Sequence, residues 1–330
     1  MLGGVMTAAN DPVLLSFEDL KGWRDHDVAP AIKAFCSTCD QLDSKNWQRV
    51  CAGLNTHKTP KALIEAHMLP VQVATGQPMV FTGYFEPEIR SQLEPDDQFK
   101  HPIYAPPPEM AGNTPWLTRE QIETTGVLKD RGLEIAWLSD PTEVFFLQIQ
   151  GSGRLKFPNG DVLRVGFAAK NGHPYRSVGK EMIRRGLVPE AEMSAETIAN
   201  WIRQNPRAGR QLMQHNPSYV FFRENAELEA NEGPVGFMGR ALTPERSIAV
   251  DPEHIPLGAF VWIEKEGENP LNQLMVAQDV GSAIKGPNRA DIFYGTGGAA
   301  GDIAGRTRDS GRMVVLLPRT LALKVTGRIE

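Results

Sequence analysis

The hydrophobic pattern of the chain changes near residue 79, and this change limits the folds that the sequence can adopt. Residues 16–70 carry apolar side chains at three- and four-residue spacing, which predicts amphipathic helices, with Thr59-Pro60 as a cap and first helical position. After residue 79 apolar and polar residues alternate, which predicts strands. The 31 glycines and 25 prolines of the 330 residues favour many turns and therefore short strands. The sequence thus predicts helices first and a mainly β chain after them.

The predicted strands form two groups that a helical stretch separates. The first strand covers 79–90, the middle strands cover 133–140, 143–153, 154–169 and 216–224, and helices are predicted within 177–213. Six further strands follow from residue 234, over 235–242, 247–251, 259–265, 274–281, 291–295 and 312–318. Six short strands in about 95 residues suggest a small closed barrel. If the strand at 79–90 completes that barrel, the middle of the chain is an insertion.

Composition and charge exclude several classes of protein. Hydrophobic residues make up 41% of the chain, which is enough for a packed core, and the formal net charge is -5 without a basic stripe, so we expect no nucleic-acid partner. No run of residues approaches the ~18 consecutive apolar residues that a membrane span needs. The first twenty residues lack the charged and apolar regions of a signal peptide.

The three cysteines, Cys36, Cys39 and Cys51, leave alternatives open. Cys36 and Cys39 form a C-x-x-C pattern, which occurs in redox and zinc sites. No second ligand pair follows at zinc spacing, and the pattern lies within a predicted helix rather than before one. Buried small residues, or one structural disulfide to Cys51, are the simpler interpretation.

Two aspartates lie twelve positions apart in a glycine-rich stretch near the end of the chain. Asp279 precedes a predicted strand-end turn, and Asp291 precedes the apolar residues Ile292–Tyr294. Glycosidic cleavage needs a protonated carboxyl beside the bridging oxygen, and a hydrolase usually adds a second carboxylate. An apolar setting would raise the pKa of Asp291 and keep a proton available. The alternative is that both are loop aspartates that accept hydrogen bonds from backbone N–H groups.

Three other segments carry polar groups that suit a sugar or carboxylate ligand. Gly151-Ser152-Gly153 follows a predicted apolar strand, where glycine allows a ligand close to the backbone, although an ordinary hairpin turn explains it equally. The irregular segment 168–180 combines Lys170 and Asn171 with aromatic and basic residues, and 81–87 places Thr82 on a strand.

Six blocks occur together and in a fixed order: FTGYFEP, EVFFLQIQGSGRL, AAKNGHPYRSVGK, NPSYVFF, VGFMGRALTPERSIAVDPEHIPLGAFVWIE and AQDVGSAIKGPNRADIFYG. Through them, residues 75–317 closely resemble the membrane-bound lytic transglycosylase A family, which cleaves murein in Gram-negative bacteria. The terminal part also resembles the three-aspartate domain, with Asp251, Asp279 and Asp291 in its aspartate positions. The resemblance implies a double-psi β-barrel with a second β-barrel domain inserted into it and a groove between them. We accordingly expect residues 1–90 and 232–330 to form a catalytic domain and residues 91–231 to form an inserted substrate-binding domain.

The resemblance also implies the chemistry. Asp291 matches the family's single catalytic aspartate, and Asp279 matches a supporting one. Groove-lining blocks of the family match Thr82, Gln150, Gly151–Gly153, Lys170 and Asn171. The family cleaves the β-1,4 bond between N-acetylmuramic acid and N-acetylglucosamine and forms 1,6-anhydromuramoyl ends, without a metal or another cofactor.

The expected partners are peptidoglycan strands and other cell-wall enzymes, and the expected state is a monomer. The expected location is the periplasm at the outer membrane, although no lipid-attachment sequence is seen near the start. Two other functions remain open, a two-carboxylate glycoside hydrolase and a glycan-binding protein without activity. The product distinguishes the hydrolase from the transglycosylase, because hydrolysis creates a reducing end and transglycosylation creates an anhydro end.

Overall fold

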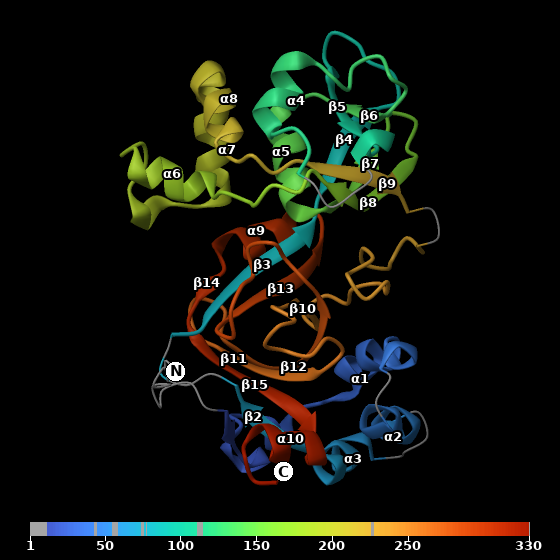
Figure 1. Ribbon diagram of the computed structural model, residues 1–330, viewed down its shortest axis with the longest axis vertical. Helices are drawn as coiled ribbons and strands as arrows, with labels where there is room; N and C mark the ends of the chain where they lie inside the picture. Colours follow the sequence, from blue (N-terminus) through green and yellow to red (C-terminus); the bar gives the residue numbers. More distant parts are fainter. Residues whose placement is uncertain are drawn as a thin grey trace, which may run out of the picture. The chain divides into compact units, whose positions relative to one another are not determined.

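The computed structural model describes residues 12–42, 45–54, 59–73, 76, 78–110, 115–225 and 228–329. The first residues, 1–11, for which the sequence shows no signal-peptide pattern, lie outside the described part. The chain forms two compact units. The first consists of 1–83, 235–295 and 307–330, and the second consists of 84–234 and 296–306, so the second unit interrupts the first (Figure 1).

The first unit contains a nine-stranded mixed sheet in the order β1-β2-β15-β11-β12-β10-β13-β3-β14. The strands are β1 (Val13–Leu14), β2 (Met68–Gln72), β3 (Val80–Glu86), β10 (Ser247–Ala249), β11 (Phe260–Lys265), β12 (Leu271–Asp279), β13 (Arg289–Thr296), β14 (Arg308–Asp309) and β15 (Gly311–Pro318). Strand β3 lies beside β13, so the early strand joins the C-terminal strands as predicted. Among the described residues, no ladder pairs the end strands β1 and β14 with each other.

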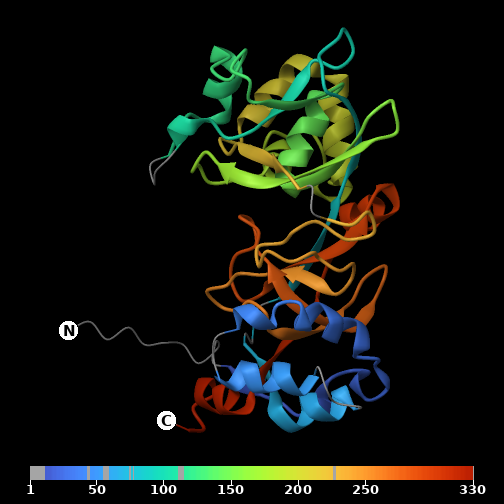
Figure 2. The same ribbon diagram turned by 90° about the vertical axis from the view of Figure 1, so that its right-hand side faces the viewer.

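Helices of the first unit cover this sheet near β11, β12 and β15 (Figure 2). They are η1 (Phe17–Asp19), η2 (Trp23–Asp25), α1 (Ala29–Cys36), η3 (Cys39–Gln41), α2 (Lys45–Leu54), α3 (Pro60–His67) and α10 (Arg319–Val325). Phe35 of α1 stacks on Phe260 with ring centroids 4.2 Å apart, and Trp23 meets Trp262 edge-on at 5.2 Å. Strand β11 is therefore buried on both faces, which explains why apolar and polar residues alternate little in its sequence.

The second unit contains a six-stranded sheet in the order β5-β6-β4-β7-β8-β9. Its strands are β4 (Glu88–Gln92), β5 (His101–Tyr104), β6 (Glu134–Leu138), β7 (Ser152–Lys156), β8 (Val162–Lys170) and β9 (Val220–Glu224). Its helices are η4 (Pro108–Met110), α4 (Arg119–Thr125), α5 (Pro141–Gln150), α6 (Val178–Arg184), η5 (Glu190–Glu192), α7 (Ala195–Gln204), α8 (Pro206–Gln214) and α9 (Gly298–Arg306). The predicted fold class, mainly β with N-terminal helices and a second β unit within the first, is confirmed.

The strand predicted over 143–153 was wrong, because residues Pro141–Gln150 form helix α5. The local sequence contains the helix boundaries: Asp140 caps the first turn by accepting from the Thr142 N–H at 2.7 Å, and Pro141 occupies the first helical position. Gly151 ends the helix in the left-handed conformation, at φ 80°. The apolar run of α5 is buried on several sides, and this removes the helical periodicity from the sequence.

Other local predictions also need correction. Residues 235–242 form a turn closed by a bridge between Val235 and Ala241, not a strand. Residues 68–72 leave the helical pattern and form β2, and the predicted first helix is a pair of short 3-10 turns. The predicted hairpin turn between β7 and β8 and the helix cap at Ser194 are confirmed.

A disulfide joins Cys39 to Cys51, so the C-x-x-C pattern is neither a redox pair nor a zinc site. It links η3 to α2 across a sequence separation of 12 residues. Cys36 is free and half-buried, and burial raises the pKa of its thiol. None of the helices in the described ranges has the length and apolar character that crossing a bilayer requires.

A buried carboxylate, Glu86 at the end of β3, is the electrostatic centre of the second unit. It is 1% exposed and accepts hydrogen bonds from Arg154 Nε at 2.8 Å, an Arg164 amino group at 2.9 Å and the Thr296 hydroxyl at 2.9 Å. The two arginines also donate to backbone carbonyls of residues 229–232. Glu86 therefore joins the end of β3 to strands β7 and β8 and to Thr296, all within the second unit.

We predict that Glu86→Gln destabilises the protein by about 3 kcal/mol, because it leaves the buried Arg164 and the partly buried Arg154 without their counter-charge. Glu88→Gln is the matched control, since Glu88 pairs with Lys156 at a surface site and should cost less than about 1 kcal/mol. Urea unfolding followed by circular dichroism measures both variants. Equal losses in the two variants would contradict the role assigned to Glu86.

Candidate functional site

The candidate site is built on four neighbouring strands of the first unit, β12, β10, β13 and β3. Asp291 is the third residue of β13, between the fully buried Ala290 and Ile292. Thr82 lies on the adjacent strand β3, and its hydroxyl donates a hydrogen bond of 2.6 Å to Oδ1 of Asp291. Two residues that are 209 positions apart in sequence therefore meet because β3 pairs beside β13.

Burial of the Asp291 carboxyl raises its pKa to about 6, because the surrounding protein solvates the charged form poorly. The Thr82 hydroxyl and the charge of Arg289 oppose this shift, and the charge of Asp279 adds to it. Arg289 does turn toward the site, since its guanidinium donates to the Thr82 hydroxyl at 3.2 Å. Burial nevertheless dominates, so the pKa of Asp291 is raised and not lowered.

The Thr82 hydroxyl has its single proton committed to Asp291 Oδ1, while its oxygen accepts from Arg289. This chain of hydrogen bonds fixes the rotation of the carboxyl group. Within the described part of the chain, Oδ2 of Asp291 has no hydrogen-bond partner in the protein. Oδ2 is thus the oxygen that can carry and exchange a proton.

Asp279 ends β12, the strand on the far side of β10. Ala249 of β10 is in register with Asp279 on one side and with Asp291 on the other. The two aspartates are therefore two strands apart, with Cα atoms about 10 Å from each other and side chains on the same face of the sheet. Oδ1 of Asp279 accepts a hydrogen bond of 2.9 Å from the Phe237 N–H.

Asp251, the third aspartate of the pattern, has a different environment. It is 3% exposed and accepts from the Gly286 N–H at 2.8 Å and from the Glu253 N–H at 3.3 Å. The Gly286 hydrogen bond is the largest cause of its lowered pKa, and Lys285 contributes a nearby positive charge. Asp251 therefore stays ionised and holds the loop that leads into β13.

The structure places the other predicted ligand residues in the second unit. Gln150 ends α5, and its Oε1 accepts from the Phe85 N–H of β3 at 3.2 Å. Gly153 is glycine for packing reasons, because a Cβ there would lie 2.6 Å from Leu147 Cδ1. Gly151 is the C-cap of α5, and a Cβ there would meet no atom within 4 Å. Ser152 begins β7. The Gly151–Gly153 segment therefore joins a helix to a strand and is not the predicted hairpin turn.

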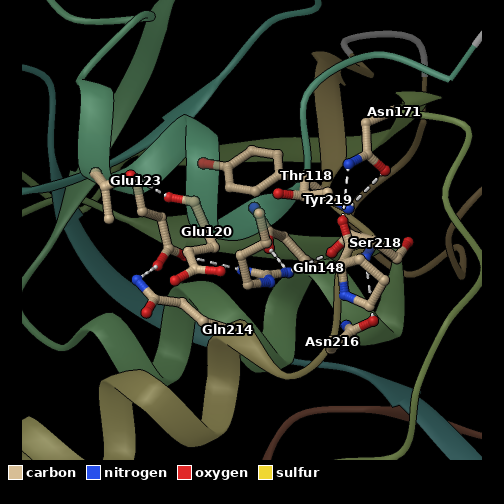
Figure 3. A network of polar contacts seen from close by, with 12 residues as sticks. Thr118, Glu120, Glu123, Gln148, Asn171, Gln214, Asn216, Ser218 and Tyr219 are labelled. Carbon is tan, nitrogen blue, oxygen red and sulfur yellow. Dashed lines mark hydrogen bonds and ion pairs between the residues drawn. The ribbon is translucent and has the colours of Figure 1, made fainter.

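Lys170 and Asn171 are adjacent but differ in their surroundings. Lys170 is exposed at the end of β8. Asn171 is 1% exposed, and its amide donates to the carbonyls of Leu117 and Pro217, both at 2.8 Å, while its oxygen accepts from the Tyr219 N–H at 2.9 Å (Figure 3). Both amide protons of Asn171 are thus used within the protein, and the side chain supports the segment that presents Lys170.

Arg119, which no sequence pattern indicates, contacts Ser218 and Tyr219 in the segment that Asn171 also binds. Its side chain is 3% exposed, and its guanidinium contacts Glu123 at 3.2 Å and the Ser218 carbonyl at 2.9 Å, with Gln148 as a further partner. The rings of Phe145 and Tyr219 lie 4.9 Å and 5.0 Å from it. Burial lowers its pKa. An arginine in the first turn of a helix gives no sequence pattern that indicates such burial.

Among the described residues, no group of three or more histidine, cysteine, aspartate or glutamate side chains is arranged to hold a metal ion. The titratable groups at the site are instead Asp291, Asp279 and Arg289. Burial and the Thr82 hydroxyl, together with the charges of the other two groups, set the pKa of Asp291. Such a set can give and take a proton at a reacting oxygen.

Two family models match the chain. The MltA specific insert domain matches residues 80–223, and the 3D domain matches residues 246–317. A membrane-bound lytic murein transglycosylase A from Vibrio cholerae is 35% identical over 246 residues, which cover 71% of this chain and 64% of that protein. The chain thus matches just under two thirds of the length of this curated relative.

Solved structures resemble the chain over nearly its full length. MltA from Neisseria gonorrhoeae has a TM-score of 0.79 and 31% identity, covering 95% of this chain and 94% of that chain. MltA from Escherichia coli with bound chitohexaose has a TM-score of 0.75 and 26% identity, covering 94% of this chain and 95% of that chain. The order of the matched domains, the sequence identity and the shared fold agree, and the chain belongs to the membrane-bound lytic murein transglycosylase A family.

Proposed function

We propose that the chain is a lytic transglycosylase of peptidoglycan. It cleaves the β-1,4 bond between N-acetylmuramic acid and N-acetylglucosamine and leaves 1,6-anhydromuramoyl ends. The observation that carries this proposal is the Asp291 carboxyl, whose pKa of about 6 lets it hold a proton near neutral pH and release it readily. The E. coli MltA structure with bound chitohexaose supports an oligosaccharide as the ligand.

In the first step, Asp291 donates the proton of its Oδ2 to the bridging oxygen. The bond between this oxygen and the anomeric carbon breaks, N-acetylglucosamine leaves with a free hydroxyl, and positive charge develops on the muramic acid ring. The ionised Asp279 lies on the same sheet face, where its negative charge favours that developing charge. Its charge also helps to keep Asp291 protonated before the reaction.

In the second step, the ionised Asp291 takes the proton from the 6-hydroxyl of the muramic acid. The 6-oxygen then bonds to the anomeric carbon of the same sugar and closes the anhydro ring, so Asp291 returns to its protonated form. The nucleophile belongs to the substrate and has a high effective molarity. One carboxyl therefore serves both steps, and no water is consumed.

The remaining residues have positioning or binding roles in this proposal. Thr82 and Arg289 fix the rotation of the Asp291 carboxyl and limit the rise in its pKa. Gln150, the Gly151–Gly153 segment and Lys170 contact the glycan, whereas Asn171 positions Lys170. Because its substrate is peptidoglycan, we propose that the enzyme acts in the periplasm at the outer membrane; that it is a monomer and that it works with other cell-wall enzymes stay predictions from the family resemblance.

Digestion of purified murein sacculi, with mass analysis of the released muropeptides, tests the function directly. We expect anhydro ends from the native protein and at least ~10²-fold less product from Asp291→Asn, which lacks the transferable proton. Asp97→Asn, at an exposed loop position, is the matched control and should keep full activity. Reducing ends in place of anhydro ends would instead establish the two-carboxylate hydrolase, and full activity of Asp291→Asn would remove Asp291 from the mechanism.

The pH dependence of kcat/KM should show the same acid. The rate should fall as pH rises above about 6, because Asp291 then loses its proton. Thr82→Val removes a hydrogen bond that stabilises the ionised form, so the pKa of Asp291 rises and the alkaline limb moves to higher pH. Thr82→Ser keeps the hydroxyl and should leave the limb in place. A limb that stays fixed in Thr82→Val would argue against Asp291 as the titrating acid.

Folding stability should also depend on Asp291. Its pKa is raised from 3.8 to about 6, so between these values the folded state binds more protons than the unfolded state, and stability falls as pH rises. The asparagine of the Asp291→Asn variant does not ionise, so the variant does not lose stability as pH rises. Its melting temperature should therefore exceed that of the native protein at pH 7.5, with little difference at pH 4. A difference that does not grow with pH would contradict the raised pKa.

A further inference from the structure

Phe237 contacts the candidate site through its backbone N–H, and the proposed mechanism gives its aromatic side chain no role. Its side chain is exposed, at 63%, the largest value among the large hydrophobic residues of the described part of the chain. Single exposed hydrophobic residues are common and need no explanation by themselves. Phe237 differs because of the rigidity of its turn and because of the residue that its backbone contacts.

The turn that carries Phe237 is fixed on both sides. The Gly236 N–H donates to the Arg240 carbonyl at 2.9 Å, and the next residue, Met238, is 7% exposed and donates its N–H to the Gln278 carbonyl at 3.2 Å. Gln41 of η3 donates to the Met238 carbonyl at 2.5 Å. Two of these contacts lie far away in sequence, so the backbone position of Phe237 is determined by the fold and not by a free loop.

A steric argument supports this close fit. A Cβ on Gly236 would lie 2.5 Å from Leu242 Cδ2 and 3.1 Å from the Gln278 carbonyl oxygen, so a larger residue would require Leu242 and the turn to shift away from each other and from β12. Arg240, at the end of the turn, donates to the Ser37 carbonyl at 2.7 Å and also pairs with Asp40. The turn is thus attached to β12 on one side and to the segment after α1 on the other.

The backbone of Phe237 lies directly against the candidate site. Its N–H donates to Asp279 Oδ1 at 2.9 Å, and Asp279 is coupled electrostatically to Asp291. An exposed aromatic ring is therefore attached to a rigid backbone that contacts one of the two carboxylates. A glycan strand bound at Asp291 is a polymer, and it extends beyond the sugar that reacts.

We propose that Phe237 is a glycan-binding residue whose ring packs against the apolar face of a pyranose of the bound strand, next to Asp279. The C–H bonds on one face of a pyranose carry slight positive charge, and the face of a phenyl ring carries negative charge, so the two attract each other in addition to their hydrophobic contact. The inference rests on the proposed function, since it assigns a binding residue to the same site.

Binding of chitohexaose, measured by calorimetry in the Asp291→Asn background, tests the proposal without turnover. Phe237→Ala should weaken binding about tenfold, and Phe237→Trp should restore it to near the parent value. Leu93→Ala is the matched control, because Leu93 is 62% exposed, and it should bind like the parent. An unchanged Kd in Phe237→Ala, or a parent protein that does not bind chitohexaose, would overturn the proposal.

Kinetics on the otherwise native enzyme separate stacking from an effect on Asp279. Phe237→Ala keeps the N–H that Asp279 accepts, so KM should rise about tenfold while kcat and the pH profile stay unchanged. A shifted pH profile with a lower kcat would overturn stacking and show that the side chain acts through Asp279. If sacculi yield no anhydro ends but the tenfold loss in chitohexaose binding remains, the transglycosylase fails and the stacking contact stands.

Discussion

The buried contact of Glu86 with Arg154 and Arg164 underlies the organisation of the chain. Strand β3 begins in the first unit, where Thr82 reaches Asp291, and ends at Glu86 in the second unit. A charge that is 1% exposed is tolerated only with partners, and these partners also bind the carbonyls of residues 229–232, just before the chain returns. One ionic cluster therefore fixes the end of the strand that supplies the hydroxyl partner of the proposed acid.

The site itself is a balance between opposing effects on one carboxyl. Burial alone would keep Asp291 protonated, whereas Thr82 and Arg289 favour its ionised form. The result, a pKa of about 6, lies where a group can act in both directions of proton transfer. Asp251 shows the opposite outcome, because the hydrogen bond from the Gly286 N–H is the largest cause of its lowered pKa. Two aspartates with similar sequence settings thus have different chemistry.

The sequence predicted these features unequally, for physical reasons. The strands, the pairing of β3 with late strands and the apolar setting of Asp291 followed from alternation and from family blocks. Helix α5 was missed because its apolar run is buried on several sides, although Asp140-Pro141 and Gly151 mark its ends. Asn171 was predicted as a ligand residue from its sequence block, and no sequence pattern indicated that carbonyls from distant segments accept both protons of its amide. Such contacts depend on tertiary structure, and residue type and spacing do not reveal them.

The interrupted topology of the first unit has a consequence for biosynthesis. Strand β2 pairs with β15, so the hydrogen bonds of Val71 in the sheet cannot form before Val315 has been synthesised. Strand β3 likewise needs β13 and β14. Residues 84–234, by contrast, form most of a unit from one continuous segment. A chain made from its N-terminus can therefore assemble this inner unit while the surrounding sheet still lacks its last strands. During that interval Thr82 has been synthesised but Asp291 has not, so the proposed acid meets the hydroxyl that adjusts its pKa only after residues 84–234 have been made.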